Sequence, residues 1–103
     1  MFIVHIDGDE LWRQVLKRAI RLSKHELDLK QFASGDEAMP YIERCLHDVD
    51  LFYMSVELPG HLTGLQVARS LRAHGYSRTI VLTSACDAPD AGWLTAHQIE
   101  FLP

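Results

Sequence analysis

The sequence is poor in the residues on which disulfide scaffolds and zinc modules are built. It has two cysteines among 103 residues, Cys45 and Cys86, and they match no CxxC spacing. Small secreted scaffolds and structural zinc sites need more cysteines, or cysteines and histidines at short fixed intervals. We therefore interpret both residues as buried or idle thiols of an intracellular protein, in preference to a disulfide or a metal pair.

Long apolar runs are missing as well. No stretch approaches the roughly 20 apolar residues of a membrane-spanning helix, and the N-terminus lacks the pattern of a signal peptide. These absences predict a cytoplasmic protein without a membrane partner. The net charge is −4, so the chain also lacks the positive charge that general nucleic-acid binding requires.

What is present fits a single globular domain spanning residues 1–103. Hydrophobic residues make up 48% of the chain and charged residues 23%, both ordinary for such a domain. Short apolar runs predict strands over residues 2–6, 27–33, 51–56, 79–83 and 99–102. Amphipathic segments between them predict four helices, which begin near Asp9, Ser34, Thr63 and Ala88. This alternation predicts an α/β fold, a doubly wound parallel sheet of five strands.

In a parallel sheet of this kind the functional residues gather in the loops after the strands. The first such loop is Asp7-Gly8-Asp9, and the others cover residues 55–60 and 83–87. Asp7 and Asp9 are also well placed to cap the following helix, and we favour that role over metal binding.

Four segments resemble the receiver domain of two-component response regulators, the CheY-like fold. "IVHIDGDELWR" resembles its acidic turn, and "FASGDEAM" resembles the second strand running into its helix. "DLFYMSVELPGHLTGLQVARSLR" resembles the phosphoacceptor strand and the next helix, and "TIVLTSA" resembles the strand that ends in a hydroxyl. The resemblance covers nearly the whole chain, and the four matches together are specific.

The resemblance implies where the groups of the receiver site should lie. The acidic pair falls on Asp7 and Gly8, the phosphorylated aspartate on Ser55, the hydroxyl on Thr83 and the switch aromatic on Phe101. The lysine would follow Pro103, so the resemblance implies a chain truncated before that lysine and before a final helix. Of the five groups that take part in the phosphotransfer chemistry, three are therefore missing: the second acid, the phosphorylated aspartate and the lysine.

We accordingly expect neither an enzyme nor a bound cofactor. Ser55 offers a neutral hydroxyl without an evident base, and Gly8 supplies no Mg²⁺ ligand. Asp7, Asp9 and Glu57 are the residues that could partly rebuild a Mg²⁺ site, and we do not expect them to do so.

A missing final helix would leave apolar surface open, on the first helix and on the sheet beneath it. The candidates for that surface are Leu11, Trp12, Val15, Leu16 and Phe101. Because soluble monomers rarely expose such a patch, we expect a homodimer or a protein partner such as a histidine kinase. A rearranged tail or residues beyond Pro103 are the other ways to cover it.

Three functional hypotheses follow. The first is a phosphorylation-independent pseudo-receiver that acts as a protein-interaction and dimerisation module in bacterial two-component signalling. The alternative is a fragment or mutant of a phosphotransfer-active receiver that takes phosphate from a histidine kinase. The third is a nucleic-acid-binding module that uses the basic residues of the first helix, which we favour least.

Overall fold

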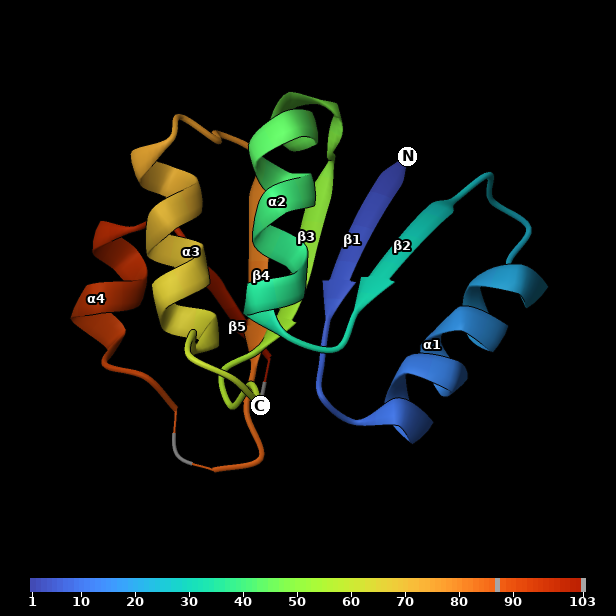
Figure 1. Cartoon of the computed structure of the whole chain (residues 1–103), viewed down its shortest axis with the longest axis horizontal. Coiled ribbons are helices and arrows are strands. Elements are labelled where there is room, and N and C mark those ends of the chain that lie inside the picture. Colours follow the sequence, from blue (N-terminus) through green and yellow to red (C-terminus); the bar gives the residue numbers. More distant parts are fainter. Residues whose placement is uncertain (87, 103) are drawn as a thin grey trace.

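The fold is a parallel sheet of five strands in the order β2-β1-β3-β4-β5, described by a computed structural model for residues 1–86 and 88–102 (Figure 1). Asp87 and Pro103 lie outside the described residues. Strands and helices alternate along the chain, and a 3-10 turn, η1, follows the second helix. The strands are β1 Phe2–Ile6, β2 Asp28–Phe32, β3 Leu51–Ser55, β4 Thr79–Thr83 and β5 Glu100–Leu102, and the helices are α1 Glu10–Leu22, α2 Gly35–Cys45, α3 Gly64–Ala73 and α4 Ala91–Ala96, with η1 at Leu46–Asp48.

The predicted fold class is confirmed, and the strand boundaries need small corrections. β2, β3 and β5 are shorter than predicted, because Leu27, Ala33, Val56 and Ile99 lie outside the strands. Val56 still donates its backbone N–H to the carbonyl of Thr83, over 2.8 Å, but the chain turns away toward α3 after this bond.

Short polar side chains begin the helices, as the sequence predicted. Asp9 accepts from the backbone N–H of Trp12, and Ser34 accepts from that of Glu37. Thr63 begins α3 with a complete capping box. The fourth helix, predicted to begin near Ala88, begins instead at Ala91 with the side chain of Asp90 as its cap. Such caps satisfy N–H groups that have no partner inside the helix.

The main core lies between one face of the sheet and helices α2, α3 and α4. Alternate strand residues point into it, among them Val4, Phe52 and Leu82, which are fully buried. Phe101 packs against the same core. Its predicted place on the exposed surface therefore needs correction: side chains alternate along a strand, so Phe101 follows its register partner Leu82 into the core.

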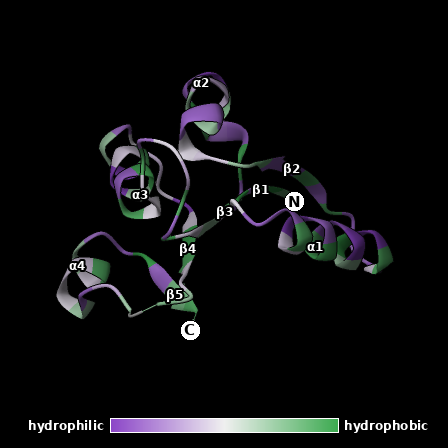
Figure 2. Cartoon of the chain, turned by 60° about the horizontal axis from the view of Figure 1, so that its bottom comes forward, coloured by the Kyte–Doolittle hydropathy of each residue, from purple (hydrophilic) through white to green (hydrophobic). Residues whose placement is uncertain are grey.

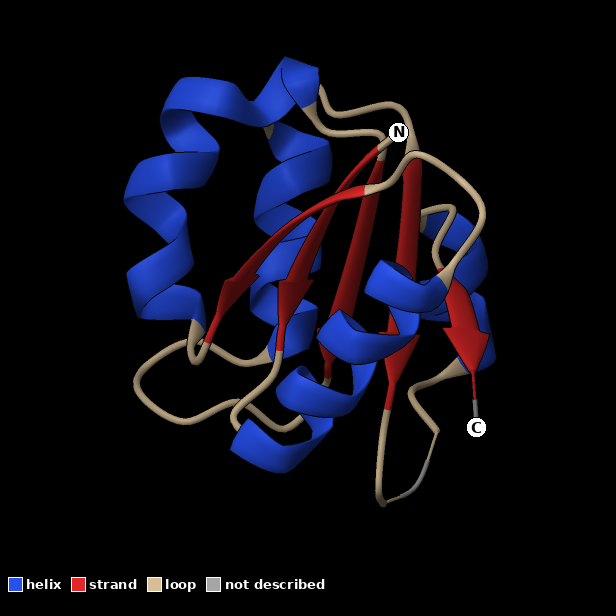
Figure 3. Ribbon diagram, turned by 90° about the vertical axis from the view of Figure 1, so that its right-hand side faces the viewer, coloured by secondary structure: helices blue, strands red, loops and turns tan. Residues whose placement is uncertain are grey.

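The opposite face of the sheet carries α1, the one helix on that side among the described residues. Figures 2 and 3 show α1 across the sheet from α2 and α3. Every residue of α1 remains at least partly exposed, and Leu16 is half-buried. A sheet covered on this face by α1 alone agrees with the predicted fold, in which a final helix is missing.

Arg72 ties the end of α3 to two later parts of the chain. Its guanidinium donates to the carbonyls of Tyr76, Arg78, His97 and Gln98, over 2.7 to 2.8 Å. These bonds fix the start of β4 and the turn between α4 and β5, so a single side chain sets the position of the last strand. No helix in the described part of the chain has the length and apolar character needed to cross a membrane.

Candidate functional site

A hollow of about 600 Å³ lies at the carboxyl ends of β1, β3 and β4. The structure brings most of the predicted site residues together on its walls: Asp7, Gly8, Asp9, Ser55, Glu57 and Thr83. Trp12 of α1 stands at its side, and the loop after β4 forms another wall. Phe101 is not among the lining residues, because it packs, partly buried, against the core.

Ser55 and Thr83 lie side by side at the ends of the neighbouring strands β3 and β4. They are register partners at the last positions of β3 and β4, and both are half-buried. Gly64 allows α3 to begin directly against this end of β3, because a Cβ on Gly64 would collide with the Ser55 carbonyl oxygen. The packing of α3 therefore fixes the backbone of Ser55.

The acidic turn after β1 is held by bonds within the chain. The carboxylate of Asp7 accepts from the backbone N–H of Asp9 over 2.9 Å, and Asp9 in turn caps α1. Arg13 donates to the Asp7 carbonyl over 2.6 Å. The predicted capping role of Asp9 is confirmed, and Asp7 supports it by orienting the turn.

His5 lies behind this turn, completely buried. Its Nδ1 contacts the side-chain amide of Gln31 at 3.1 Å, and its ring meets Tyr53 edge to face. Because the Gln31 amide nitrogen can only donate, Nδ1 accepts and Nε2 carries the proton. That Nε2 has no hydrogen-bond partner among the described residues and lies 3.8 Å from the Asp7 carboxylate. Burial lowers the pKa of His5, so the ring is neutral at neutral pH.

Gly8 is covered by the loop that follows β3. A Cβ built on Gly8 would lie 2.7 Å from Cδ of Pro59, closer than real contacts allow. The same loop is fastened to α2, where the Asp36 carboxylate accepts from the backbone N–H of His61 over 2.9 Å. The space that a second acidic side chain would need is therefore occupied by Pro59.

Glu57 clamps the loop after β4. Its carboxylate accepts from the Ser84 hydroxyl over 2.7 Å and from the backbone N–H groups of Ala85 and Cys86 over 3.0 and 3.2 Å. The hydrogen bond from Ser84, followed by those from Cys86, lowers the pKa of Glu57. The carboxylate is thus charged at neutral pH and turned toward the loop.

These bonds decide how well the acidic residues suit Mg²⁺. A hard cation needs several converging oxygens. Gly8 supplies none, Glu57 serves the β4 loop, and Asp7 and Asp9 serve the turn and the helix cap. Within residues 1–86 and 88–102, no group of three or more Asp, Glu, His or Cys side chains is arranged to hold a metal. As placed, these carboxylates make hydrogen bonds within the chain.

Several residues of this region escaped sequence reasoning. The role of His5 could not be read from a strand pattern, since an apolar run with one histidine gives no sign of its partner. The clamp by Glu57 depends on two loops that are distant in sequence. The one sign of this contact in the sequence was the hydroxyl of Ser84, which directly follows the fourth strand.

Comparisons with known proteins bear on the family and the fold of the chain. The family model of the response regulator receiver domain matches residues 3–99. Among solved structures, chemotaxis protein CheY4 of Vibrio cholerae is similar at a TM-score of 0.79 and 16% identity, over 97% of this chain and 82% of that one. The receiver domain of the histidine kinase CKI1 of Arabidopsis thaliana, complexed with Mg²⁺ and BeF3−, is similar at 0.78 and 18%, over 98% and 78%.

A third similar structure is a DNA-binding response regulator of the LuxR family from Staphylococcus aureus, with a TM-score of 0.78 and 17% identity, over 97% of this chain and 84% of that one. At these identities the likeness establishes the fold. No curated protein sequence matches the chain.

Proposed function

The chain belongs to the response regulator receiver domain family, and from that premise we propose that it is a cytoplasmic pseudo-receiver. In this proposal it serves two-component signalling as a protein-interaction and dimerisation module whose state does not depend on phosphorylation. Receiver domains work with histidine kinases and other signalling proteins, and this chain would keep the binding role without the phosphoryl switch.

The observation that carries the proposal is Ser55 at the end of β3, beside Thr83 on the wall of the hollow. A serine hydroxyl becomes a nucleophile when a base removes its proton. His5 is no such base: it is buried behind the acidic turn and directed at Asp7. The proposal is supported by a serine at the position that the resemblance assigns to the phosphorylated aspartate, and by a histidine that is turned away from it.

The surrounding contacts support the same reading. Pro59 fills the space beside Gly8, and the Glu57 carboxylate is engaged by the loop after β4. In an active receiver a bound cation and a phosphoryl group would draw such groups together. Here Glu57 is bound instead by the Ser84 hydroxyl and by backbone N–H groups of the loop after β4.

The test is phosphorylation by a small donor. The protein is incubated with acetyl phosphate and Mg²⁺, and its intact mass is measured, with a phosphorylatable receiver treated in parallel as the control for the donor. We expect no added phosphoryl group. Saturable incorporation that is lost in Ser55→Ala would overturn the proposal.

The alternative, an altered phosphotransfer-active receiver, is tested by restoring the acids. It predicts that Gly8→Asp combined with Ser55→Asp takes up phosphate in the same assay. The proposal predicts that the restored acids remain unphosphorylated, because Pro59 crowds position 8.

A further inference from the structure

The outer surface of α1 is apolar and uncovered. Four of its large side chains are well exposed: Leu11 at 69%, Trp12 at 40%, Val15 at 46% and Leu22 at 77%. They recur at helical spacing together with Ala19, so they form one continuous stripe along the helix. We call these five residues the outer stripe. Soluble monomers seldom leave a connected apolar stripe of this kind in water.

We infer that a second copy of this chain covers the outer stripe, with the two α1 helices antiparallel about a two-fold axis near Val15. This inference deepens the proposed interaction role and rests on it, since it names the partner and the surface. A closed two-fold pairing uses the same surface on both copies, so it leaves no stripe exposed.

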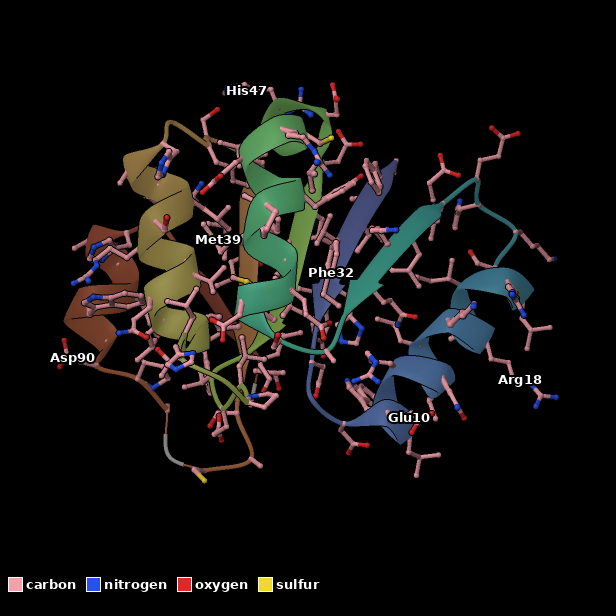
Figure 4. All side chains as sticks on the ribbon, in the orientation of Figure 1. Glu10, Arg18, Phe32, Met39, His47 and Asp90 are labelled. Atoms are coloured by element: carbon pink, nitrogen blue, oxygen red, sulfur yellow. The ribbon has the colours of Figure 1, made fainter. Side chains whose placement is uncertain are left out.

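The distribution of charge along α1 selects the antiparallel arrangement. Asp9 and Glu10 stand at the start of the helix, and Arg18, Arg21 and Lys24 lie toward its end. Figure 4 shows Glu10 and Arg18 on the two halves of α1, with Arg18 directed away from the sheet. A parallel pair would bring the basic ends together, whereas an antiparallel pair sets each basic end beside the acidic start of the other copy.

The flank of the outer stripe is also self-complementary. Glu10, Gln14, Arg18 and Arg21 follow one side of the stripe at spacings of four, four and three residues. In an antiparallel two-fold pair, the same flank of each helix meets its counterpart. Glu10 of one copy then lies near Arg21 of the other, and opposite charges meet at both ends of the pair.

The length of the helix limits the area that the contact can bury. A helix of 13 residues is about 20 Å long. One face of such a helix buries less than the roughly 800 Å² per partner of a standard interface. The pairing should therefore be reversible and visible as a concentration-dependent mass.

Trp12 connects this surface to the candidate site. It belongs to the outer stripe and also lines the hollow beside Asp9 and Glu57. A second copy seated on the stripe therefore covers one side of the hollow. Association of two chains would change the surroundings of the site without any phosphoryl group.

The experiment is sedimentation velocity over a concentration series. We expect the wild type to move from monomer to dimer, and Val15→Glu to stay monomeric with an unchanged circular dichroism spectrum, because Val15 is half exposed. Ala73→Glu, at an exposed position of α3, is the matched control and should dimerise like the wild type.

The charge pair tests the orientation and does not depend on whether Val15→Glu folds. Glu10→Arg should weaken the dimer, Arg21→Glu should weaken it as well, and the double exchange should restore it. A second readout is Trp12 fluorescence in a Trp93→Phe background, which should shift to shorter wavelength as the dimer forms.

Three results overturn the inference: a wild type that stays monomeric, a dimer that Val15→Glu does not affect, or a double exchange that fails to restore association. The first result would leave the phosphorylation-independent role intact, since that role is tested by the mass measurement with acetyl phosphate.

Discussion

The close approach of Pro59 restricts which residue fits at position 8. In the pattern of a receiver this position holds an acidic side chain, and here the Pro59 ring lies within 2.7 Å of where a Cβ would be. A proline ring cannot move aside as a flexible side chain can. A side chain at position 8 is therefore sterically opposed unless Pro59 shifts.

We predict that Gly8→Ala destabilises the protein by about 1–3 kcal/mol, as overpacking of a close contact does. In a Pro59→Ala background the same change should cost less, because the ring that it meets has gone. The free energies of unfolding of the four proteins, measured in urea, give the coupling directly. Equal costs in both backgrounds would mean that Pro59 does not restrict position 8.

His5 makes the stability of the fold dependent on pH. Burial lowers its pKa below the usual 6.5, so below that pH the unfolded chain binds a proton that the folded chain does not. The free energy of unfolding therefore falls as the pH drops below 6.5, with a slope of at most about 1.4 kcal/mol per pH unit from this group.

The prediction for His5 is checked by urea unfolding between pH 7.5 and 5, above the range in which carboxylates titrate. The slope should be smaller in His5→Gln, which keeps a polar side chain near Gln31 but does not titrate. An identical slope in the variant would assign the pH dependence to other groups.

At the scale of elements, two carboxylates hold loops in place by accepting hydrogen bonds from them. Glu57 holds the loop after β4, and Asp36 at the start of α2 holds the loop after β3 through His61. The backbone bond from His61 lowers the pKa of Asp36, and the Ser84 hydroxyl lowers that of Glu57. Because both pKa values are depressed, each bond contributes stability at neutral pH and loses it as the pH falls through the lowered pKa.

We predict that Glu57→Gln loosens the loop after β4. An amide has one acceptor oxygen and no charge, so it cannot hold the Ser84 hydroxyl and two backbone N–H groups as the carboxylate does. Hydrogen exchange at the amides of Ala85 and Cys86 should become faster. Glu100→Gln, an exposed residue of β5, removes the same charge elsewhere and should leave both amides unchanged.

The elements themselves were largely predictable because their signals are local. Helix starts at Asp9, Ser34 and Thr63 follow from short polar side chains ahead of amphipathic segments, and buried strands follow from apolar runs. What could not be predicted depends on distant contacts. The four carbonyls that Arg72 joins lie 4 to 26 residues away along the chain, and no spacing rule connects them.

The sequence predicted which residues line the site, but it did not predict the hydrogen bonds that they make. Residues that follow parallel strands must meet at one edge of the sheet, which is why Asp7, Ser55 and Thr83 share one hollow. The directions of their side chains depend on packing. Phe101 shows the same limit, since a shift by one residue decides which face of a strand a side chain takes.

At the scale of the whole molecule, the two faces of the sheet differ sharply. One face holds the core under α2, α3 and α4, and the other carries α1 alone among the described residues. We expect the exposed face to be where the molecule meets its partners. The hollow at the carboxyl ends of the strands is lined by Asp7, Ser55 and Thr83, the positions that the resemblance assigns to a receiver site.

The central claim is that the state of this protein does not depend on phosphorylation at the hollow. The most direct measurement is the amide NMR spectrum of the whole chain, recorded with and without Mg²⁺ and beryllofluoride, a mimic of the phosphoryl group. The account predicts unchanged signals at residues 55–57 and 83–86. Saturable shifts of these signals at low concentrations of the mimic would contradict it, because they would show a site that still binds the ion and the phosphoryl mimic together.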